Sequence, residues 1–384
     1  MAATSLAAAL VADFEQHFQI RPLAVFSPGR VTLLGKHAGH FGGLVLPVSI
    51  DRGAVVAVAL QRNGRARLYS YDSDVVVDAS LAAAPPAGKS WMQRLLGVAA
   101  GFQRLGIEVP GFDCMFGANL PVGAGLSAAA AVASGLAYAL NELLGAGLGP
   151  MELARLALRA EADAEGAAGL TDYFTSLCSR PAHLARLDCR SLHFEYLPFD
   201  ASTYRWVLCD AGVSRSRADA GYAARQEECA RGLAVLRRHF PELRSLRDAT
   251  PMQLHRYRGE MGEGVYRRCA FVLAENQRVE LAAYHLAAGN VRAVGQQMYA
   301  SHAGLRNDYA VSCPELDELV YIAQEFPAAL GARMLGGLGS CTLNLVPAAE
   351  ADAFVQHVQT AYARRRAGAL ATYQLGGGGV LTQV

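Results

Sequence analysis

Residues 120–137 read LPVGAGLSAAAAVASGLA, and this stretch decides how the rest of the chain is interpreted. Gly123 and Gly125 let the backbone bend without the steric penalty of a Cβ atom. An alanine-rich run with high helical propensity follows, and the first N–H groups of a helix, together with its dipole, favour a bound anion. We therefore predict a glycine-rich turn that enters a helix at Ser127 and cradles a phosphate group.

The predicted turn is short of hydroxyl groups. A phosphate-binding loop that serves a metal-bound nucleotide usually carries serine or threonine hydroxyls near the helix entrance. Here Ala128, Ala129 and Ala130 follow Ser127. The sequence therefore predicts phosphate binding and leaves open whether the loop also supports a reaction.

The composition predicts a globular protein with a small-molecule partner. The 384 residues are 52% hydrophobic, which is enough to bury two packed lobes. The 35 basic and 34 acidic residues nearly cancel, so we expect neither nucleic acid nor a membrane surface as a partner. The apolar stretch 120–140 is long enough to span a bilayer, but it opens with a turn and is rich in Ala, Gly and Ser, so no membrane span is expected.

Cysteine usage and the N-terminus predict a cytoplasmic protein. The eight cysteines are dispersed without a CxxC pair, so they are expected to be buried thiols in a reducing compartment. Asp13 and Glu15 come soon after the first alanines, which is typical of an amphipathic helix and not of a secretion signal.

Strand and helix patterns are intermixed along the chain. Strands are predicted over 23–34, 44–60 and 66–77, helices over 91–106, 128–145 and 151–166, and a strand pair within 182–199. A strand pattern restarts near residue 204, and charged helices follow. We place the boundary there, between an N-terminal lobe of residues 1–203 and a C-terminal lobe of residues 204–384.

Two further segments of the first lobe carry candidate functional groups. SPGRVTLLGKHAGHFGG, residues 27–43, is a glycine-rich connection between two predicted strands, and such loops often bind ligands; a solvated turn is the alternative. GLTDYFTSL, residues 169–177, sets Asp172 among apolar neighbours, as an active carboxylate requires; a helix N-cap formed by Thr171 or Asp172 is the alternative.

The second lobe contains one more glycine-rich bend, GGLGSC at residues 336–341. Alone it is a weak signal. Together with the bend in 120–137 it favours a nucleotide held between the two lobes.

The chain resembles the galactokinase branch of the GHMP small-molecule kinases over nearly its whole length. The segments that carry the resemblance are SPGRVTLLGKHAGHFGGLVLPVSI, LPVGAGLSAAAA, GARMLGGLGSCTLNLV, PGFDCMF, LDCRSL, ENQRV and SHAGLRNDYAVSCPELDELV. The resemblance implies an α+β fold of two lobes, an N-terminal lobe like domain 2 of ribosomal protein S5 and a ferredoxin-like C-terminal lobe. It also implies transfer of the ATP γ-phosphate, with Mg²⁺, to a sugar hydroxyl, which is the anomeric one in galactokinases.

The resemblance assigns roles to individual residues. Asp172 matches the catalytic aspartate and Arg30 the arginine that pairs with it; facing Arg30, Asp172 should stay ionised and accept the hydroxyl proton. Residues expected to contact the sugar are Lys36, His37, Gly39, His40, Gly169 and Tyr222. Residues expected to contact ATP are Ser70, Trp91, Gly123, Ala124, Gly125, Leu126, Ser127, Ala128, Ala129 and Gly337. Glu161 matches a metal ligand if one residue is deleted between it and Asp172.

The chain departs from the family pattern in two places. The family's GEHTDY is GKHAGH here, so Lys36 and Gly39 replace two carboxylates that hold sugar hydroxyls. Each lost charge-assisted hydrogen bond is worth about 1.5–3 kcal/mol, enough to weaken galactose binding strongly. The second departure is Ala129, which stands where the family has a metal-binding serine.

Three functions remain open on the sequence. The first is a sugar kinase whose specificity has moved away from galactose, for example toward a sugar acid that pairs with Lys36. The second is a catalytically impaired relative that binds sugar or nucleotide as a sensor. The third is a kinase of a non-sugar alcohol, which the galactokinase-like segments around Tyr222 and Cys313 disfavour. A monomer or weak homodimer is expected.

Overall fold

The computed structural model describes residues 3–35, 37–83, 91–121, 124–160, 167–213, 215–335, 340–366, 368 and 370–384. Its larger sheet has the strand order β12-β1-β2-β5-β3-β4, with β6 paired to β2 and β7 paired to β6. The strands are β1 (Leu23–Leu34), β2 (Leu44–Leu60), β3 (Arg65–Ser70), β4 (Val75–Ser80), β5 (Phe112–Ala118), β6 (His183–Asp188), β7 (Phe194–Pro198) and β12 (Thr382–Gln383). All pairs are antiparallel except β3 with β5.

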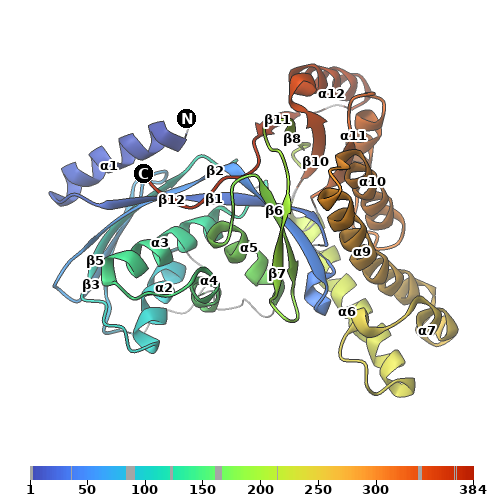
Figure 1. Cartoon of the computed structure of the whole chain (residues 1–384), viewed down its shortest axis with the longest axis horizontal. Coiled ribbons are helices and arrows are strands. Elements are labelled where there is room, and N and C mark those ends of the chain that lie inside the picture. The colour runs from blue at the N-terminus through green and yellow to red at the C-terminus, as the bar shows by residue number, and fades with distance from the viewer. Residues whose placement is uncertain are drawn as a thin grey trace.

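Helices cover both faces of this sheet (Figure 1). On one face lies α1 (Ala3–Phe18), whose Leu10 and Phe14 are fully buried against β1, β2 and β5. On the other lie α2 (Trp91–Arg104), α3 (Ala128–Leu144), α4 (Pro150–Arg159) and α5 (Ala167–Leu177). The small residues of α3, among them Gly135, let it pack closely on the sheet, because a Cβ at Gly135 would lie 2.8 Å from the Val56 side chain.

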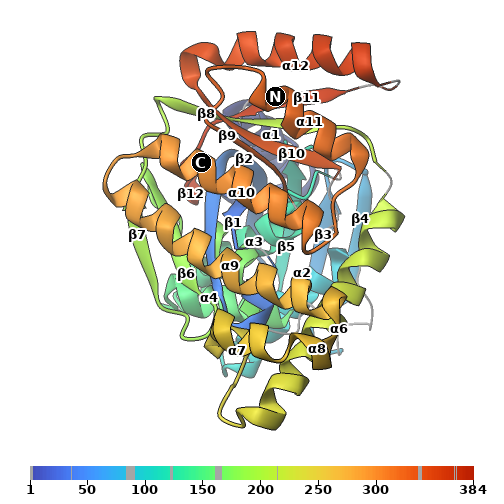
Figure 2. The same ribbon diagram turned by 90° about the vertical axis from the view of Figure 1, so that its right-hand side faces the viewer.

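The second half of the chain forms a smaller sheet covered by helices. Its strand order is β11-β8-β10-β9, with β8 (Tyr204–Asp210), β9 (Gly331–Met334), β10 (Cys341–Pro347) and β11 (Ala371–Leu375). The α-helices are α6 (Arg215–His239), α7 (Pro251–Arg256), α8 (Arg258–Met261), α9 (Glu263–Ala287), α10 (Val291–Asn307), α11 (Pro314–Gln324) and α12 (Ala351–Arg365). Figure 2 shows α9 and α10 crossing in front of the larger sheet.

The two sheets share an apolar core. Leu33 and Leu46 from the larger sheet belong to the same buried cluster as Leu343 from the smaller sheet and Val279 from α9. After β11 the chain returns to the larger sheet, where β12 pairs with β1. The predicted α+β fold is confirmed, and β8 begins at the predicted restart; the lobe boundary itself stays a proposal.

Two findings bear on the class of protein expected from the composition. No helix in the described part of the chain combines the length and apolar character needed to cross a membrane. The eight cysteines are free thiols, and all but the half-buried Cys313 are buried.

Candidate active site

The candidate site begins with an ion pair between β1 and α5. Arg30 lies in the middle of β1 and is only 5% exposed. Its Nε donates to Asp172 Oδ1 at 2.8 Å, and its Nη2 lies 2.5 Å from the same oxygen. The structure therefore brings together the two residues predicted to be catalytic, which are 142 positions apart in sequence.

The second oxygen of the carboxylate is held by the glycine-rich turn. Ser127 Oγ donates to Asp172 Oδ2 at 2.7 Å, and Arg30 Nη1 donates to the Gly125 carbonyl at 3.3 Å. The Arg30 N–H also donates to the Leu126 carbonyl. Asp172 is thus fixed from two sides, while about 30% of its side chain stays exposed to a ligand.

The alternative role of Asp172 as a helix N-cap is wrong. The helix α5 starts five residues earlier, at Ala167, so Asp172 lies in its middle. The hydroxyl of Ser176, one turn further on, donates to the Pro28 carbonyl at 2.8 Å and ties α5 to β1. Asp172 therefore does not satisfy a helix end, and its carboxylate is oriented by groups from other elements.

The glycine-rich turn ends at the start of a helix, as predicted. Gly125 has φ +75° and a Cβ there would meet open space, so its glycine is required by the backbone angle and not by crowding. Ser127 is the residue before α3, and it adopts a left-handed φ of 60°. Its hydroxyl makes no cap bond to α3, because that hydroxyl is bonded to Asp172.

The first residues of α3 are open to a ligand. Ala128 and Ala129 are exposed, whereas Ala124 and Leu126 of the turn are buried. The first N–H groups of a helix lack intrahelical acceptors, and α3 points its positive end at this spot. The exposed start of α3, next to the Arg30–Asp172 pair, is therefore the candidate anion site.

Ser70 and Trp91, two of the residues predicted to contact ATP, are brought together by a third residue, Phe116. Ser70 ends β3 and is paired in register with Phe116 of β5. Trp91, the first residue of α2, contacts the same Phe116 ring edge-on at a centroid distance of 5.1 Å. Sequence reasoning missed Phe116; the signal available for it was its place at the end of the family-like segment PGFDCMF.

The connection between β1 and β2, residues 35–43, is here called the β1–β2 loop. His37 is buried in it, and its ring packs on Tyr222, Phe271 and Tyr309 with centroid distances of 5.2, 6.3 and 4.7 Å. His40 is exposed, and its Nε2 is hydrogen-bonded to the Tyr222 hydroxyl. The loop is therefore docked on α6 through Tyr222, and His37 occupies an aromatic cage.

Tyr222 connects the β1–β2 loop with the ion pair. Burial raises the pKa of the Tyr222 hydroxyl, and the Asp172 carboxylate raises it further, with Arg30 acting in the opposite direction. Tyr222 therefore stays neutral and able to donate a hydrogen bond close to Asp172. Gly39, which is buried in the loop, and Gly169, which lies on α5 three residues before Asp172, complete the described part of the predicted sugar-contacting set.

Several predicted site residues fall outside the described residues: Lys36, Gly123, Glu161 and Gly337. The described residues hold no cluster of three or more His, Cys, Asp or Glu side chains suited to a metal ion. Asp172 is bonded to Arg30 and Ser127, so few described donors are left around the turn.

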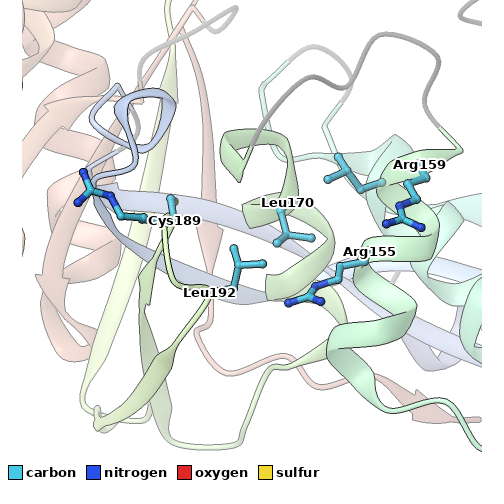
Figure 3. A pocket seen from close by; sticks show the side chains of 7 residues that line it. Arg155, Arg159, Leu170, Cys189 and Leu192 are labelled. Carbon is cyan, nitrogen blue, oxygen red and sulfur yellow. The ribbon is translucent and has the colours of Figure 1, made fainter. Parts of the chain in front are cut away.

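A separate hollow of about 470 Å³ lies between α4, α5 and the β6–β7 turn. Figure 3 shows Leu170 and Leu192 lining it, with Arg155 and Arg159 from α4 on one side. Leu170 and Asp172 are two residues apart on α5, so their side chains point to nearly opposite sides of the helix. The hollow therefore does not belong to the candidate active site.

Comparison with known families agrees with this geometry. Residues 93–180 match the GHMP kinases N terminal domain, and residues 282–364 match the GHMP kinases C terminal domain. Residues 12–60, which include β1 and the β1–β2 loop, match the galactokinase galactose-binding signature. Fold and site together define a phosphotransferase of the GHMP kinase class.

Similar proteins narrow this class. A galactokinase of Streptomyces coelicolor is 37% identical over 91% of this chain and 91% of its own length, and one of Roseiflexus sp. is 33% identical over 91% and 90%. The crystal structure of Lactococcus lactis galactokinase complexed with galactose superposes with a TM-score of 0.88 at 26% identity, over 99% of this chain and 100% of that one. The chain therefore belongs to the galactokinase family of the GHMP kinases.

Proposed function

We propose that this protein transfers the γ-phosphate of ATP to the anomeric hydroxyl of a sugar or sugar acid, with a specificity that has moved away from galactose. The observation that carries the proposal is the Asp172 carboxylate, held by Arg30 and Ser127 beside the open N-terminus of α3. A phosphoryl transfer needs an anion site, a compensating cation and a base for the acceptor hydroxyl. Here the start of α3 is the anion site, Arg30 is the cation and Asp172 is the base.

Each group has a defined task in this proposal. The N–H groups at the start of α3 bind the phosphates of ATP. Asp172 accepts the proton of the sugar hydroxyl, while Arg30 fixes the carboxylate and compensates the charge that develops during transfer. Ser127 keeps the second carboxylate oxygen in place. Mg²⁺, with Glu161 as the proposed protein ligand, would neutralise phosphate charge when bound with ATP.

The shifted specificity rests on the β1–β2 loop. The chain matches the galactose-binding signature, yet Lys36 and Gly39 stand where the family has carboxylates. Two carboxylates that would accept hydrogen bonds from sugar hydroxyls are therefore missing, and Lys36 adds a positive charge. A sugar that carries its own carboxylate would pair with the added cation, Lys36.

A substrate panel with an ADP-release assay tests the proposal. The panel contains galactose, galacturonic acid, glucuronic acid and their neutral relatives, and the expected outcome is a higher kcat/KM for an acidic sugar than for galactose. The double variant Lys36→Glu/Gly39→Asp should reverse this order, lowering the KM for galactose by about tenfold or more. Absence of turnover with every sugar, while ATP still binds, would refute the proposal.

A second candidate function is a sensor that binds nucleotide or sugar without efficient transfer. It is supported by the hydroxyl content of the turn, because residues 128–130 are alanines and the Ser127 hydroxyl is bonded to Asp172. Calorimetry with a non-hydrolysable ATP analogue, with and without Mg²⁺, separates the two functions. Nucleotide binding that depends on Mg²⁺ would count against the sensor.

A further inference from the structure

Both ends of the β1–β2 loop are bonded to one helix of the second half of the chain. The N–H of Gly35 donates to Glu275 Oε1 at 3.0 Å, and the N–H of Leu44 donates to Asn276 Oδ1 at 2.8 Å. Glu275 and Asn276 are consecutive residues of α9, which crosses in front of the larger sheet (Figure 2). One short segment of α9 therefore holds the loop where it leaves β1 and where it enters β2.

The fit at these two attachments is tight. Gly35 has φ +90°, and a Cβ there would lie 2.2 Å from the Leu44 carbonyl oxygen. A Cβ at Gly43 would lie 2.4 Å from Asn276 Oδ1. A side chain at Gly43 would push the loop away from Asn276, and one at Gly35 would collide with the backbone where the loop enters β2, so both ends of the loop need glycine in this arrangement.

Glu275 is itself rigidly held. It is 1% exposed, its Oε1 also accepts from Ser301 Oγ at 2.9 Å, and its Oε2 accepts from Arg278 Nε at 2.7 Å. Burial by itself would raise the pKa of Glu275, but the charges of Arg278 and Arg333 and the Gly35 N–H hold the pKa below its usual range. The carboxylate is therefore ionised, and both of its oxygens accept hydrogen bonds. It cannot turn away from Gly35 without losing these bonds.

Two arginines of the second half add attachments of the same kind. Arg333, fully buried on β9, donates from Nη1 to the carbonyls of Thr32 and Leu33 at 3.0 and 2.7 Å, just before the loop. Arg247 Nη1 donates to the Gly42 carbonyl at 2.9 Å. Like Glu275 and Asn276, these groups bond the backbone, so they set the path of the loop whatever side chains it carries.

We propose that Glu275 and Asn276 are positioning residues that hold the β1–β2 loop in its sugar-binding shape, an inference that rests on the proposed function. They act through the loop backbone and not on the substrate. This arrangement explains how the loop side chains can differ from the family pattern while the loop keeps its place beside Asp172 and Tyr222. It also makes the placement of α9 against the larger sheet a determinant of sugar affinity.

The proposal is tested in the full-length chain with Asn276→Ala, which removes the acceptor of the Leu44 N–H, and with Asn276→Asp, which keeps an acceptor oxygen. The matched control is Asn290→Ala. Asn290 Oδ1 accepts the Ala293 N–H at 3.1 Å at the start of α10, so this variant loses a comparable bond elsewhere in the same half of the chain. The measurements are the KM for the best sugar of the panel, the KM for ATP, and hydrogen exchange at the Leu44 amide.

Asn276→Ala is expected to raise the KM for the sugar by about tenfold, as for loss of one acceptor to a part-buried N–H, and to change the KM for ATP by less than about twofold. Exchange at Leu44 should become at least about tenfold faster. Asn276→Asp keeps the acceptor but loses the bond from Nδ2 to the Val272 carbonyl, so it should recover only part of both effects, and Asn290→Ala should show neither. Equal rises of the two KM values, or unchanged exchange at Leu44 in Asn276→Ala, would overturn the proposal.

Hydrogen exchange separates this proposal from the proposed function. If the wild-type chain phosphorylates no sugar, the proposed function fails, but the Leu44 amide still reports on the attachment. Unchanged exchange in Asn276→Ala would then overturn the positioning role. Faster exchange at Leu44 with unchanged exchange in Asn290→Ala would support it.

Discussion

The hydroxyl of Ser127 donates a 2.7 Å hydrogen bond to Asp172 Oδ2, so the residue that leads into α3 also fixes the carboxylate of α5. The turn proposed to bind phosphate and the proposed base are thereby joined in one unit, with Arg30 on the other carboxylate oxygen. A displacement of the turn on nucleotide binding would be transmitted directly to Asp172. The one hydroxyl of the turn is therefore bonded to the carboxylate that is proposed as the base.

Replacing the carboxylate is the most direct test of catalysis. Asp172→Asn keeps the size of the side chain but removes the proton acceptor, so kcat should fall by about 10²–10⁴-fold, with little change in the Kd for ATP. The control is Asp113→Asn, which alters an aspartate that is also paired with an arginine, Arg67, but is fully buried outside the site. Its kcat should stay near the wild-type value. An Asp172→Asn enzyme within about tenfold of wild type would rule out general-base catalysis by this residue.

Two variants of Ser127 separate its hydrogen bond from its backbone strain. Both Ser127→Ala and Ser127→Gly lose the bond to Asp172, and their kcat should fall by a similar factor. Only glycine relieves the left-handed backbone, so Ser127→Gly should exceed Ser127→Ala in free energy of unfolding by about 1 kcal/mol. Urea denaturation measures the difference. Equal stabilities would mean that the turn relaxes when the hydroxyl is lost.

Restoring a hydroxyl at the start of α3 should strengthen the response to Mg²⁺. Ala129→Ser returns the family's metal-binding residue to an exposed position, so little strain is expected. The Mg²⁺ concentration for half-maximal activity should fall several-fold, and kcat should rise. Ala128→Ser is the matched control, because it adds the same group at the neighbouring exposed position. An equal response of both variants would indicate a general effect of hydroxyls on the helix end.

Acid stability tests the attachment of the β1–β2 loop through Arg247. Burial raises the pKa of Asp188, but the Arg247 guanidinium and the N–H groups of Arg190 and Ser191 outweigh it and lower the pKa to about 2 from the usual 3.8. A depressed carboxyl pKa stabilises the fold above the unfolded value and loses that contribution as the pH falls through the folded value. The wild type should therefore lose about 2 kcal/mol of unfolding free energy between pH 4 and pH 2 through this residue.

The variant Asp188→Asn cannot lose this contribution. Its unfolding free energy should lie below that of the wild type at pH 7, and the gap should narrow by about 2 kcal/mol as the pH falls from 4 to 2. Urea denaturation along a pH series measures both curves. A gap that stays constant over this range would show that Asp188 titrates alike in the folded and unfolded chains.

The sequence by itself determined the secondary structure around the site. The segments LAVFSPGRVTLL and LVLPVSIDRGAVVAVAL are β1 and β2 from end to end, because both are rich in β-branched and apolar residues, whereas the glycine-rich segment between them is not. The alanine run from Ala128 is α3, and glycine at residue 125 marks the left-handed bend before it. These are local properties, set by propensity and by the backbone angles that each residue allows.

Only the tertiary structure decided which residues of these elements contact one another. The partner of the Ser127 hydroxyl, the burial of His37 among three aromatic rings, and the use of Phe116 to join Ser70 and Trp91 depend on segments up to 272 residues apart. The mid-helix place of Asp172 was missed because Thr and Asp favour helix starts, a preference that packing of α5 on β1 overrides. A sequence pattern reflects how residues that are close along the chain behave. A hydrogen bond or a ring contact depends instead on which segments the fold places side by side.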